Sequence, residues 1–473
     1  MSSEPPASSS TSPQGFWHDL RAALRGTAHD YTSGTIGRAI FLLAVPMVIE
    51  MAMESVFAVV DVFFVGRLGA VAVATVGLTE SLMIVIYTIA FGLSIGATAT
   101  VSRRIGEKDP DGAARAAVQV LLLGLALSIV LGIVGVIWAP ELLALMGADE
   151  AVLREGTMFA RVMLGGSASA FLLFLVNAVF RGAGDAAVAM RVLIIGNGIN
   201  CVLDPALIFG LGPFPELGLT GAAVATTIGR GVGCLIALMY LGKGTGHLAV
   251  ARRHVRVEPT TMWTIASLSG WGTLQVALSS MSWIGLVRVT SGFGSTAMAG
   301  YTIAIRIVLF ALMPAFGIGA AAATMVGQAL GAQLPTRAEQ SVWAAVRVNL
   351  VCLGLIGVVF LVFAPQLVGL FTADAAVASV GVFGLRAIGA GFPLYAIGMV
   401  LEQAFNGAGD NQTPTWINFF SFWVVQIPLA WGLATQGGMA ERGVFVAVPI
   451  AYLVMTAVSA VMFRRGAWKG KAV

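Results

Sequence analysis

The chain has 473 residues, of which 58% are hydrophobic and only 11% are charged. Soluble domains carry about 25% charged residues, so this composition excludes an ordinary soluble enzyme, and it excludes a disordered chain as well. The net charge of +4 comes from basic residues in short polar stretches, which does not suggest a nucleic-acid-binding protein. A polytopic, all-α membrane protein remains, because each crossing needs about 20 apolar residues.

The first 35 residues are polar and rich in Ser and Pro, and we expect a mostly disordered tail with a short interfacial helix at 14–25. Apolar segments follow from residue 36 onward, too late and too long for a signal peptide. Twelve of them are predicted to be transmembrane helices, at 38–66, 72–104, 115–138, 155–181, 187–210, 219–241, 260–290, 297–329, 340–364, 378–405, 412–434 and 442–463.

Twelve spans place both ends of the chain on the same side of the membrane. The connections and tails on that side hold most of the Lys and Arg residues. The opposite loops hold only Arg67, Arg154 and Arg442, with Arg161 at a helix start. The positive-inside rule therefore predicts a multi-pass protein of the plasma (inner) membrane with both termini in the cytoplasm.

An internal repeat organises the chain. The motif Gly182-Ala183-Gly184-Asp185 recurs at 407–410, and Phe91-Gly92 recurs at 316–317, both at an offset of 225 residues. Each half contains six spans, so the halves have the same orientation and form parallel repeats, an arrangement common in transporters. The predicted units are a tail at 1–35, an N-terminal lobe at 36–241, a basic linker at 242–259, a C-terminal lobe at 260–464 and a tail at 465–473.

Three acidic residues share one face of the first span, because Glu50, Glu54 and Asp61 are separated by four and seven residues. An ionisable side chain inside a span costs about 2.5–3.5 kcal/mol, so it usually faces a cavity or marks a functional path. The alternative is that Glu50 or Glu54 pairs with a buried arginine. Pro46 lies one turn before Glu50 and is expected to bend the helix.

The fifth span carries a second polar set. Asn200 and Asp204 lie one turn apart, and Asn177 in the fourth span can donate to a carboxylate there. Thr226 and Thr227 in the sixth span either contribute hydroxyls or bond to their own helix backbone. Two carboxylates that are close in a low dielectric repel each other, so such a site either takes up a proton or holds Na⁺.

The second half offers fewer charges at membrane depth. At the repeat offset Asn177 maps to Glu402, which is a second candidate for cation coupling or else a solvated acid at the cytoplasmic mouth. Arg288 and Arg306 lie in the seventh and eighth spans, where they either neutralise the acidic cluster or extend to an interface. The acids of the first span have uncharged counterparts: Gln275, Ser279 and Leu286.

Catalytic and metal-binding patterns are missing from the sequence. The Gly-rich loops lack the Lys-Ser/Thr ending of a phosphate-binding loop, and all four His residues lie in the tail or the linker. The three Cys residues fall in apolar stretches without the spacing of a zinc site. We therefore expect no enzyme activity, no cofactor and no direct use of ATP.

Several of these motifs together resemble the MATE (multidrug and toxic compound extrusion) family, over about residues 35–465. The similarity rests on the first-span residues Ala44-Val45-Pro46 and Val59-Val60-Asp61, on the loops Arg181-Gly182-Ala183-Gly184-Asp185 and Gly407-Ala408-Gly409-Asp410, and on Gly221-Ala222-Ala223-Val224-Ala225-Thr226. The resemblance implies two six-helix lobes in a V. It also implies export of amphipathic, usually cationic compounds in exchange for H⁺ or Na⁺.

The resemblance further implies a cation site in the first lobe. Asp61, Asn177, Asn200 and Asp204 match its positions, and bending of the first helix at Pro46 accompanies ion binding in such proteins. The sequence departs from the family in two respects. The seventh span has no acidic residue, where some relatives place a coupling Glu, and Glu50 and Glu54 stand where many members carry neutral residues.

The expected partners are small amphipathic, drug-like molecules and membrane lipids, bound by a protein that is expected to be monomeric. Candidate walls for a flat hydrophobic cation, which are alternatively plain packing residues, are Met53, Phe57, Phe171, Phe174, Thr226, Met281 and Trp283. A lipid-linked precursor flippase of related fold is the main alternative function. A membrane receptor or scaffold without transport is a further alternative.

Overall fold

The computed structural model describes residues 13–26, 29–244 and 246–471, which are almost entirely helical and contain no β-strand. The long helices are α2 (Ile36–Val65), α3 (Ala70–Gly106), α4 (Pro110–Ile137), α6 (Glu150–Ala183), α7 (Ala186–Phe209), α8 (Leu219–Lys243), α9 (Pro259–Ser291), α10 (Ser295–Gly331), α11 (Pro335–Gly369), α12 (Ala375–Gly407) and α15 (Glu441–Arg465). The shorter elements are α1 (Pro13–Arg25), η1 (Gly66–Leu68), α5 (Ala139–Leu145), η2 (Arg252–His254), α13 (Gln412–Asn418), the π-helix η3 (Phe419–Gln426), α14 (Ile427–Thr435) and η4 (Ala467–Gly470).

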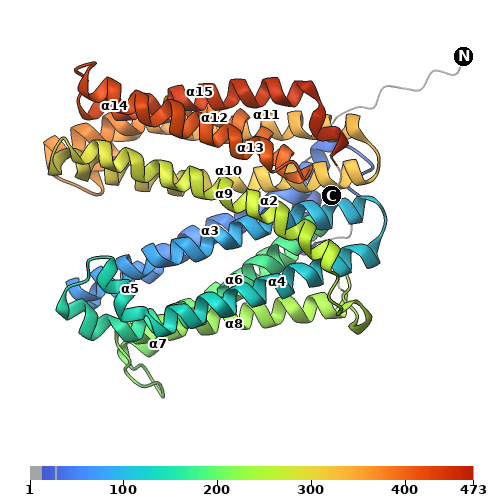
Figure 1. The fold of residues 1–473 in the computed structure, drawn as a ribbon, viewed down its shortest axis with the longest axis horizontal. Coiled ribbons are helices and arrows are strands. Elements are labelled where there is room, and N and C mark those ends of the chain that lie inside the picture. Colours follow the sequence, from blue (N-terminus) through green and yellow to red (C-terminus); the bar gives the residue numbers. More distant parts are fainter. Residues whose placement is uncertain (1–12, 27–28, 245, 472–473) are drawn as a thin grey trace, which may run out of the picture.

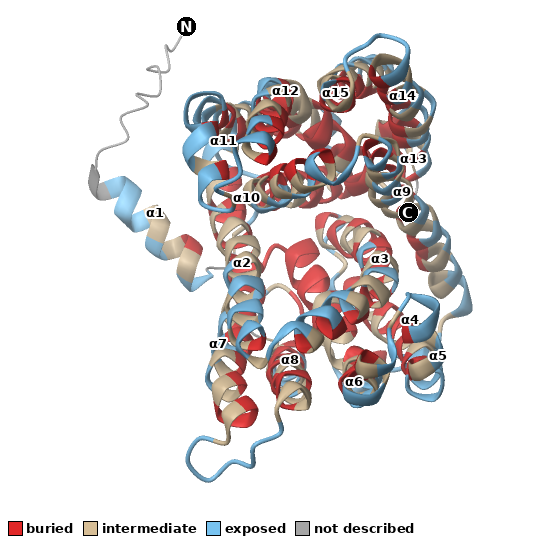
Figure 2. Cartoon of the chain, turned by 90° about the vertical axis from the view of Figure 1, so that its left-hand side faces the viewer, coloured by how far each residue is buried: buried red, intermediate tan, exposed pale blue. Residues whose placement is uncertain are grey.

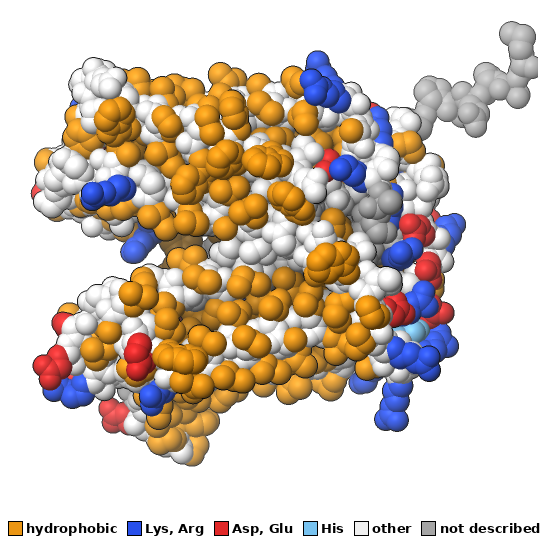
Figure 3. All heavy atoms as spheres, viewed as in Figure 1, with side chains coloured by type: hydrophobic (Ala, Val, Ile, Leu, Met, Phe, Trp, Pro, Cys, Tyr) orange, Lys and Arg blue, Asp and Glu red, His pale blue; other side chains and the backbone are white. Residues whose placement is uncertain are grey.

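All twelve predicted spans are helical in the structure. The span at 412–434 consists of α13, η3 and α14 in succession. Within the described part of the chain, eleven helical segments are long and apolar enough to cross a membrane. The twelfth, α9, has 33 residues but is rich in Ser, Thr and Gly, which makes it more polar. A predominantly apolar outer surface is visible in Figure 3, as expected for helices that face lipid.

Two lobes diverge from one end of the molecule into a V (Figure 1), the N-lobe formed by α2–α8 and the C-lobe by α9–α15. Figure 2 views the open end of the V, with the C-lobe above and the N-lobe below. The repeat extends to the backbone conformation: φ is 102° at Gly69 and 91° at Gly294, and 58° at Lys108 and 60° at Gln333. The predicted architecture of two parallel six-helix lobes is confirmed.

The first helix of each lobe also packs against the other lobe. The residues of α2 around Leu43 and Met47 belong to the hydrophobic core of the C-lobe, whereas Val65, near the end of α2, packs in the N-lobe. In the same way α9 packs along α3, and Ile265 lies in the core of the N-lobe. Pro46 therefore lies within the part of α2 that is embedded in the opposite lobe, and the helix continues through it without interruption.

Close backbone contacts hold the lobes together at the narrow end of the V. A Cβ atom on Gly106 of α3 would overlap the Gln328 carbonyl of α10, and one on Gly331 would overlap the Arg103 carbonyl of α3. Gly106 and Gly331 are equivalent in the repeat. Thr324 donates to the Arg181 carbonyl at 3.0 Å, so polar bonds add to this contact. Only glycine permits this approach of α3 to α10.

Replacing Gly106 by Val is therefore expected to separate the lobes at the narrow end, because the side chain fills the space of the Gln328 carbonyl. Pulsed electron-spin distance measurements between labels at positions 108 and 333 should show a longer distance in G106V. Gly77→Val on the same helix is the matched control, since nothing lies within 4 Å of a Cβ atom there. Unchanged distances in G106V would contradict the expectation.

Part of the polar N-terminal segment packs against the bundle. The helix predicted at 14–25 is present as α1, while residues 1–12 lie outside the described part. Tyr31 is buried and donates to the Gly184 carbonyl at 3.2 Å. Arg337 donates to the carbonyl oxygens of Tyr31, Ser33 and Gly34. The stretch from Tyr31 to Gly34 is thus packed on the bundle, which corrects the expectation of disorder for this part of the tail.

Candidate functional site

Two glutamates of α2 each form an ion pair with an arginine of a neighbouring N-lobe helix. Glu50 Oε1 lies 2.6 Å from Arg181 of α6, and the two side chains are 3% and 7% exposed. Asn177 of the same helix donates to Glu50 Oε1 at 3.4 Å. The structure therefore agrees with the alternative in which Glu50 pairs with a buried arginine. Asn177 forms its hydrogen bond with Glu50 rather than with a residue of the fifth span.

The second pair lies one turn further along α2. Arg230 of α8 donates two hydrogen bonds to Glu54, at 2.7 and 2.9 Å, in the bidentate geometry that guanidinium and carboxylate groups favour. The Arg230 guanidinium also lies 5.0 Å from the centre of the Phe57 ring. The two pairs together connect α2 to both α6 and α8.

The arginines that neutralise the acidic cluster are not the ones that the sequence singled out. In the described part of the chain Arg288 and Arg306 form no ion pair with Glu50, Glu54 or Asp61. Arg181 lies at the end of the predicted fourth span, next to a loop, and Arg230 lies within the predicted sixth span. An arginine in the middle of an apolar segment is a signal that identifies Arg230, because such a side chain needs a partner.

Asp61 faces a small cavity within the N-lobe. The cavity has a volume of about 20 Å³ and is also lined by Thr79 and Glu80 of α3 and by Thr226 of α8. A space of this size accepts one water molecule or one small cation. Glu80 of α3 thus belongs to the same polar site as Asp61.

Thr226 connects this cavity to the polar residues of α7. Asn200 donates to the Thr226 hydroxyl at 3.0 Å, and Asp204 lies one turn further along α7. Asp204 is completely buried, and within the described residues neither of its carboxylate oxygens has a hydrogen-bond partner. An ionised carboxylate in that position is strongly unfavourable, so the site favours a bound proton or cation. The predicted set of Asp61, Asn200 and Asp204 therefore shares one region around Thr226.

The C-lobe has a related polar cluster, but its acidic residue, Glu402, does not lie on the first helix of the lobe as Glu50 does. At the repeat offset, Glu50, Asn177 and Arg181 correspond to Gln275, Glu402 and Asn406. Glu402 is 8% exposed and lies beside the side-chain amides of Gln275 and Asn418. The counterpart of Arg181 is Asn406, and among the described residues no basic side chain forms an ion pair with Glu402, in contrast to Glu50.

Some of the predicted cavity walls are packing residues, and the others are exposed or half-buried. Phe171 is 1% exposed in the hydrophobic core of the N-lobe, so it is a packing residue and not a wall. Phe174 packs edge-on against Phe91, with ring centres 4.4 Å apart. Trp283 packs against the core of the C-lobe, and Met281 is 51% exposed. Met53 and Phe57 are half-buried on α2, and Thr226 lines the Asp61 cavity.

Two equivalent aspartates anchor the segments that follow each lobe. Asp185 accepts a hydrogen bond from the His247 backbone at 3.0 Å, and its other oxygen lies 3.2 Å from His247 Nδ1. Asp410, its repeat counterpart, pairs with Lys471 at 3.2 Å. The hydrogen bond to Asp185 raises the pKa of His247, although burial opposes the increase.

The His247 contact is expected to depend on pH. The pKa of His247 is higher in the folded state than in the unfolded state. The contact therefore contributes its full stabilisation of the folded protein below about pH 6.5, and this contribution is lost as the pH rises through the raised pKa. His247→Gln should lower the free energy of unfolding by about 0.5–1 kcal/mol near pH 6 and have little effect near pH 9. Thermal unfolding of both proteins across this range tests the prediction, and an equal difference at both pH values would contradict it.

Parallel six-helix repeats with acidic residues buried inside them are typical of a membrane transporter. The family model described as MatE matches residues 46–206 and 273–431, more than half of the chain. The chain therefore belongs to the MATE family, whose members are transporters and not enzymes. Across the described residues no group of three or more His, Cys, Asp or Glu side chains is arranged to hold a metal ion.

Similar proteins cover almost the whole chain. "Probable multidrug resistance protein YoeA" of Bacillus subtilis is 26% identical over 424 residues, which are 89% of this chain and 92% of that protein. "FAD transporter" of Shewanella oneidensis is 26% identical over 436 residues, 90% and 94% of the two chains. A structure described as the outward-facing conformation of a multidrug resistance MATE family transporter has a TM-score of 0.87 and 27% identity, covering 93% of this chain and 98% of that one.

Proposed function

We propose that this protein is a secondary active exporter that moves amphipathic, often cationic molecules out of the cell in exchange for H⁺ or Na⁺. The observation that carries the proposal is Asp204, a fully buried carboxylate near the Asp61 cavity to which the described residues donate no hydrogen bond. A proton or cation that enters this region neutralises the carboxylate, and its departure restores an unfavourable charge. Ion binding and protein conformation are coupled through that difference.

The coupling acts through α2, which carries Asp61 and contacts both lobes. Movement of its second half changes the Asp61 cavity, while its first half stays embedded in the core of the C-lobe. Pro46 removes one backbone hydrogen bond from the helix and so provides a place to bend. Lys and Arg side chains gather at the narrow end of the V (Figure 3), which supports an orientation with that end and both termini in the cytoplasm.

The lipid-linked precursor flippase has less support. Arg181 and Arg230, the arginines beside the acidic face of α2, are each neutralised by a glutamate, so they offer no free positive charge to a pyrophosphate group. The relative described as an FAD transporter makes a flavin nucleotide a relevant second substrate.

The decisive test is transport by the purified protein in liposomes, with a fluorescent lipophilic cation and with FAD as alternative substrates. A proton gradient and a sodium gradient are imposed separately. We expect the wild type to move the cation under one of these gradients and Asp61→Asn to lose at least nine-tenths of that activity, with an unchanged elution volume and melting temperature. If the protein transports FAD and not the cation, the substrate class is a flavin nucleotide instead of a lipophilic cation. Transport by the wild type that does not depend on a gradient would overturn the antiport mechanism.

A further inference from the structure

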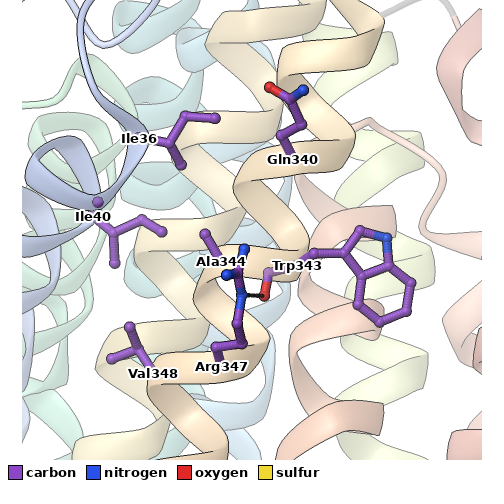
Figure 4. A pocket seen from close by; sticks show the side chains of 8 residues that line it. Ile36, Ile40, Gln340, Trp343, Ala344, Arg347 and Val348 are labelled. Atoms are coloured by element: carbon purple, nitrogen blue, oxygen red, sulfur yellow. Dashed lines mark hydrogen bonds between the residues drawn. The ribbon is translucent and has the colours of Figure 1, made fainter. Parts of the chain in front are cut away.

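A groove opens between the beginnings of α2 and α11, outside the V and away from the acidic residues. Its volume is about 590 Å³, within the usual range for small-molecule sites. The walls are mostly apolar, and Figure 4 shows Ile36 and Ile40 of α2 opposite Ala344 and Val348 of α11. Both helices begin at the narrow end of the V, so the groove lies at the level where the termini are.

Arg347 lies in this groove at a depth where an arginine is unusual. At about 1.5 Å per residue, α11 is about 52 Å long, and Arg347 lies about 18 Å from its start. If the hydrocarbon layer of about 30 Å is centred on α11, Arg347 lies a few Å inside it. The side chain is directed back toward the start of the helix, since Nε donates to the Trp343 carbonyl at 3.3 Å.

The acidic residues nearest in sequence to the groove are engaged elsewhere. Glu339 of α11 pairs with Lys469. Asp19 of α1 pairs with Arg38 at the start of α2, at 2.9 Å. Of the described acidic residues, none lies within ion-pair distance of Arg347, so its positive charge is available to a molecule in the groove.

Helix α1 extends sideways from the bundle beside α2 and α11, as Figure 2 shows. It exposes Phe16 and Trp17, at 49% and 61%, together with Arg21 and Arg25. Exposed aromatic and basic residues on a short helix are typical of segments that lie in a membrane interface. Trp343 of the groove is held in place by edge-on packing against Phe463, and tryptophan favours the same interface.

We propose that the groove between α2 and α11 is a binding site for one acidic phospholipid of the leaflet that faces the termini. One acyl chain occupies the apolar part between Ile40 and Val348, and the phosphate accepts hydrogen bonds from Arg347. A zwitterionic lipid fills the same groove less well, because its ammonium group is repelled by the guanidinium. The negative lipids of the cytoplasmic leaflet supply this ligand, so the inference rests on the proposed orientation.

Native mass spectrometry of the full chain, released from mixed phosphatidylglycerol and phosphatidylcholine with identical acyl chains, tests the site. We expect the wild type to retain one phosphatidylglycerol and to prefer it over phosphatidylcholine by about fivefold, which corresponds to the electrostatic attraction of one arginine. Arg347→Gln should abolish the preference. Arg386→Gln is the matched control and should preserve it, because Arg386 is also exposed and bonded to a backbone carbonyl, that of Leu361.

A photoactivatable phosphatidylglycerol locates the lipid. Cross-links should map to residues 340–348 and disappear in Val348→Trp, which fills the groove while leaving Arg347 in place. Equal retention of the two lipids by the wild type, an unchanged preference in Arg347→Gln, or cross-links confined to other helices would each overturn the proposal. None of these measurements uses a substrate or a gradient, so their outcome is separate from that of the transport test.

Discussion

Replacing Arg181 by Met is expected to destabilise the protein by about 3–5 kcal/mol, because it leaves the Glu50 carboxylate buried without a counter-charge. Both side chains are less than one-tenth exposed, so water cannot replace the missing partner. The double substitution Glu50→Gln with Arg181→Met removes the charge as well and should recover most of the loss. Unfolding in mixed detergent micelles, followed by tryptophan fluorescence, measures the difference.

Arg386→Met is the control for this prediction, since Arg386 is exposed and has no acidic partner within the described residues. It should change the free energy of unfolding by no more than about 0.5 kcal/mol. A loss below about 1 kcal/mol in Arg181→Met, or no recovery in the double variant, would mean that the pair contributes little and that Glu50 is protonated in the folded protein.

The second large effect is expected at Asp204. Asp204→Asn keeps the shape of the side chain but can no longer exchange a proton or bind a cation with a full charge. We expect gradient-driven export to fall at least tenfold, while substrate binding without a gradient stays within about twofold. Stability should remain equal or increase, because the substitution removes a buried carboxylate that has no hydrogen-bond partner in the described part of the chain.

Glu402→Gln distinguishes the two lobes. Glu402 lies beside the amides of Gln275 and Asn418, and no second carboxylate of the described residues lies close to it. We therefore expect its replacement to reduce export less than about threefold. If Glu402→Gln abolishes export and Asp204→Asn does not, the coupling site lies in the C-lobe.

Much of the fold follows from local sequence properties. The apolar segments predict twelve helices, because a span must satisfy its backbone hydrogen bonds internally within the bilayer. The repeat offset, read from motifs such as Gly182–Asp185, predicts two parallel lobes. Spacing along α2 also predicts that Glu50, Glu54 and Asp61 share a face, since helical periodicity is a local rule.

The partners of these acids could not be predicted in the same way. Glu50 pairs with Arg181, 131 positions away, and Glu54 pairs with Arg230, 176 positions away. Neither distance along the chain constrains which helices become neighbours. The positions of Arg288 and Arg306 within spans suggest them as partners, but the packing of α2 against α7 and α10 places Glu50 and Glu54 within reach of arginines on α6 and α8 instead.

The sequence by itself determined the helices, the repeat and the acidic face of α2, since each depends on residue type and spacing, whereas the grouping of Asp61 with Asn200 and Asp204 was implied by the resemblance to the MATE family. Only the tertiary structure decided that α2 and α9 pack across the lobes, that Asn177 binds Glu50, and that Asp204 has no hydrogen-bond partner among the described residues. These features depend on long-range packing, where a single side chain is satisfied or left unpaired according to which helix lies next to it.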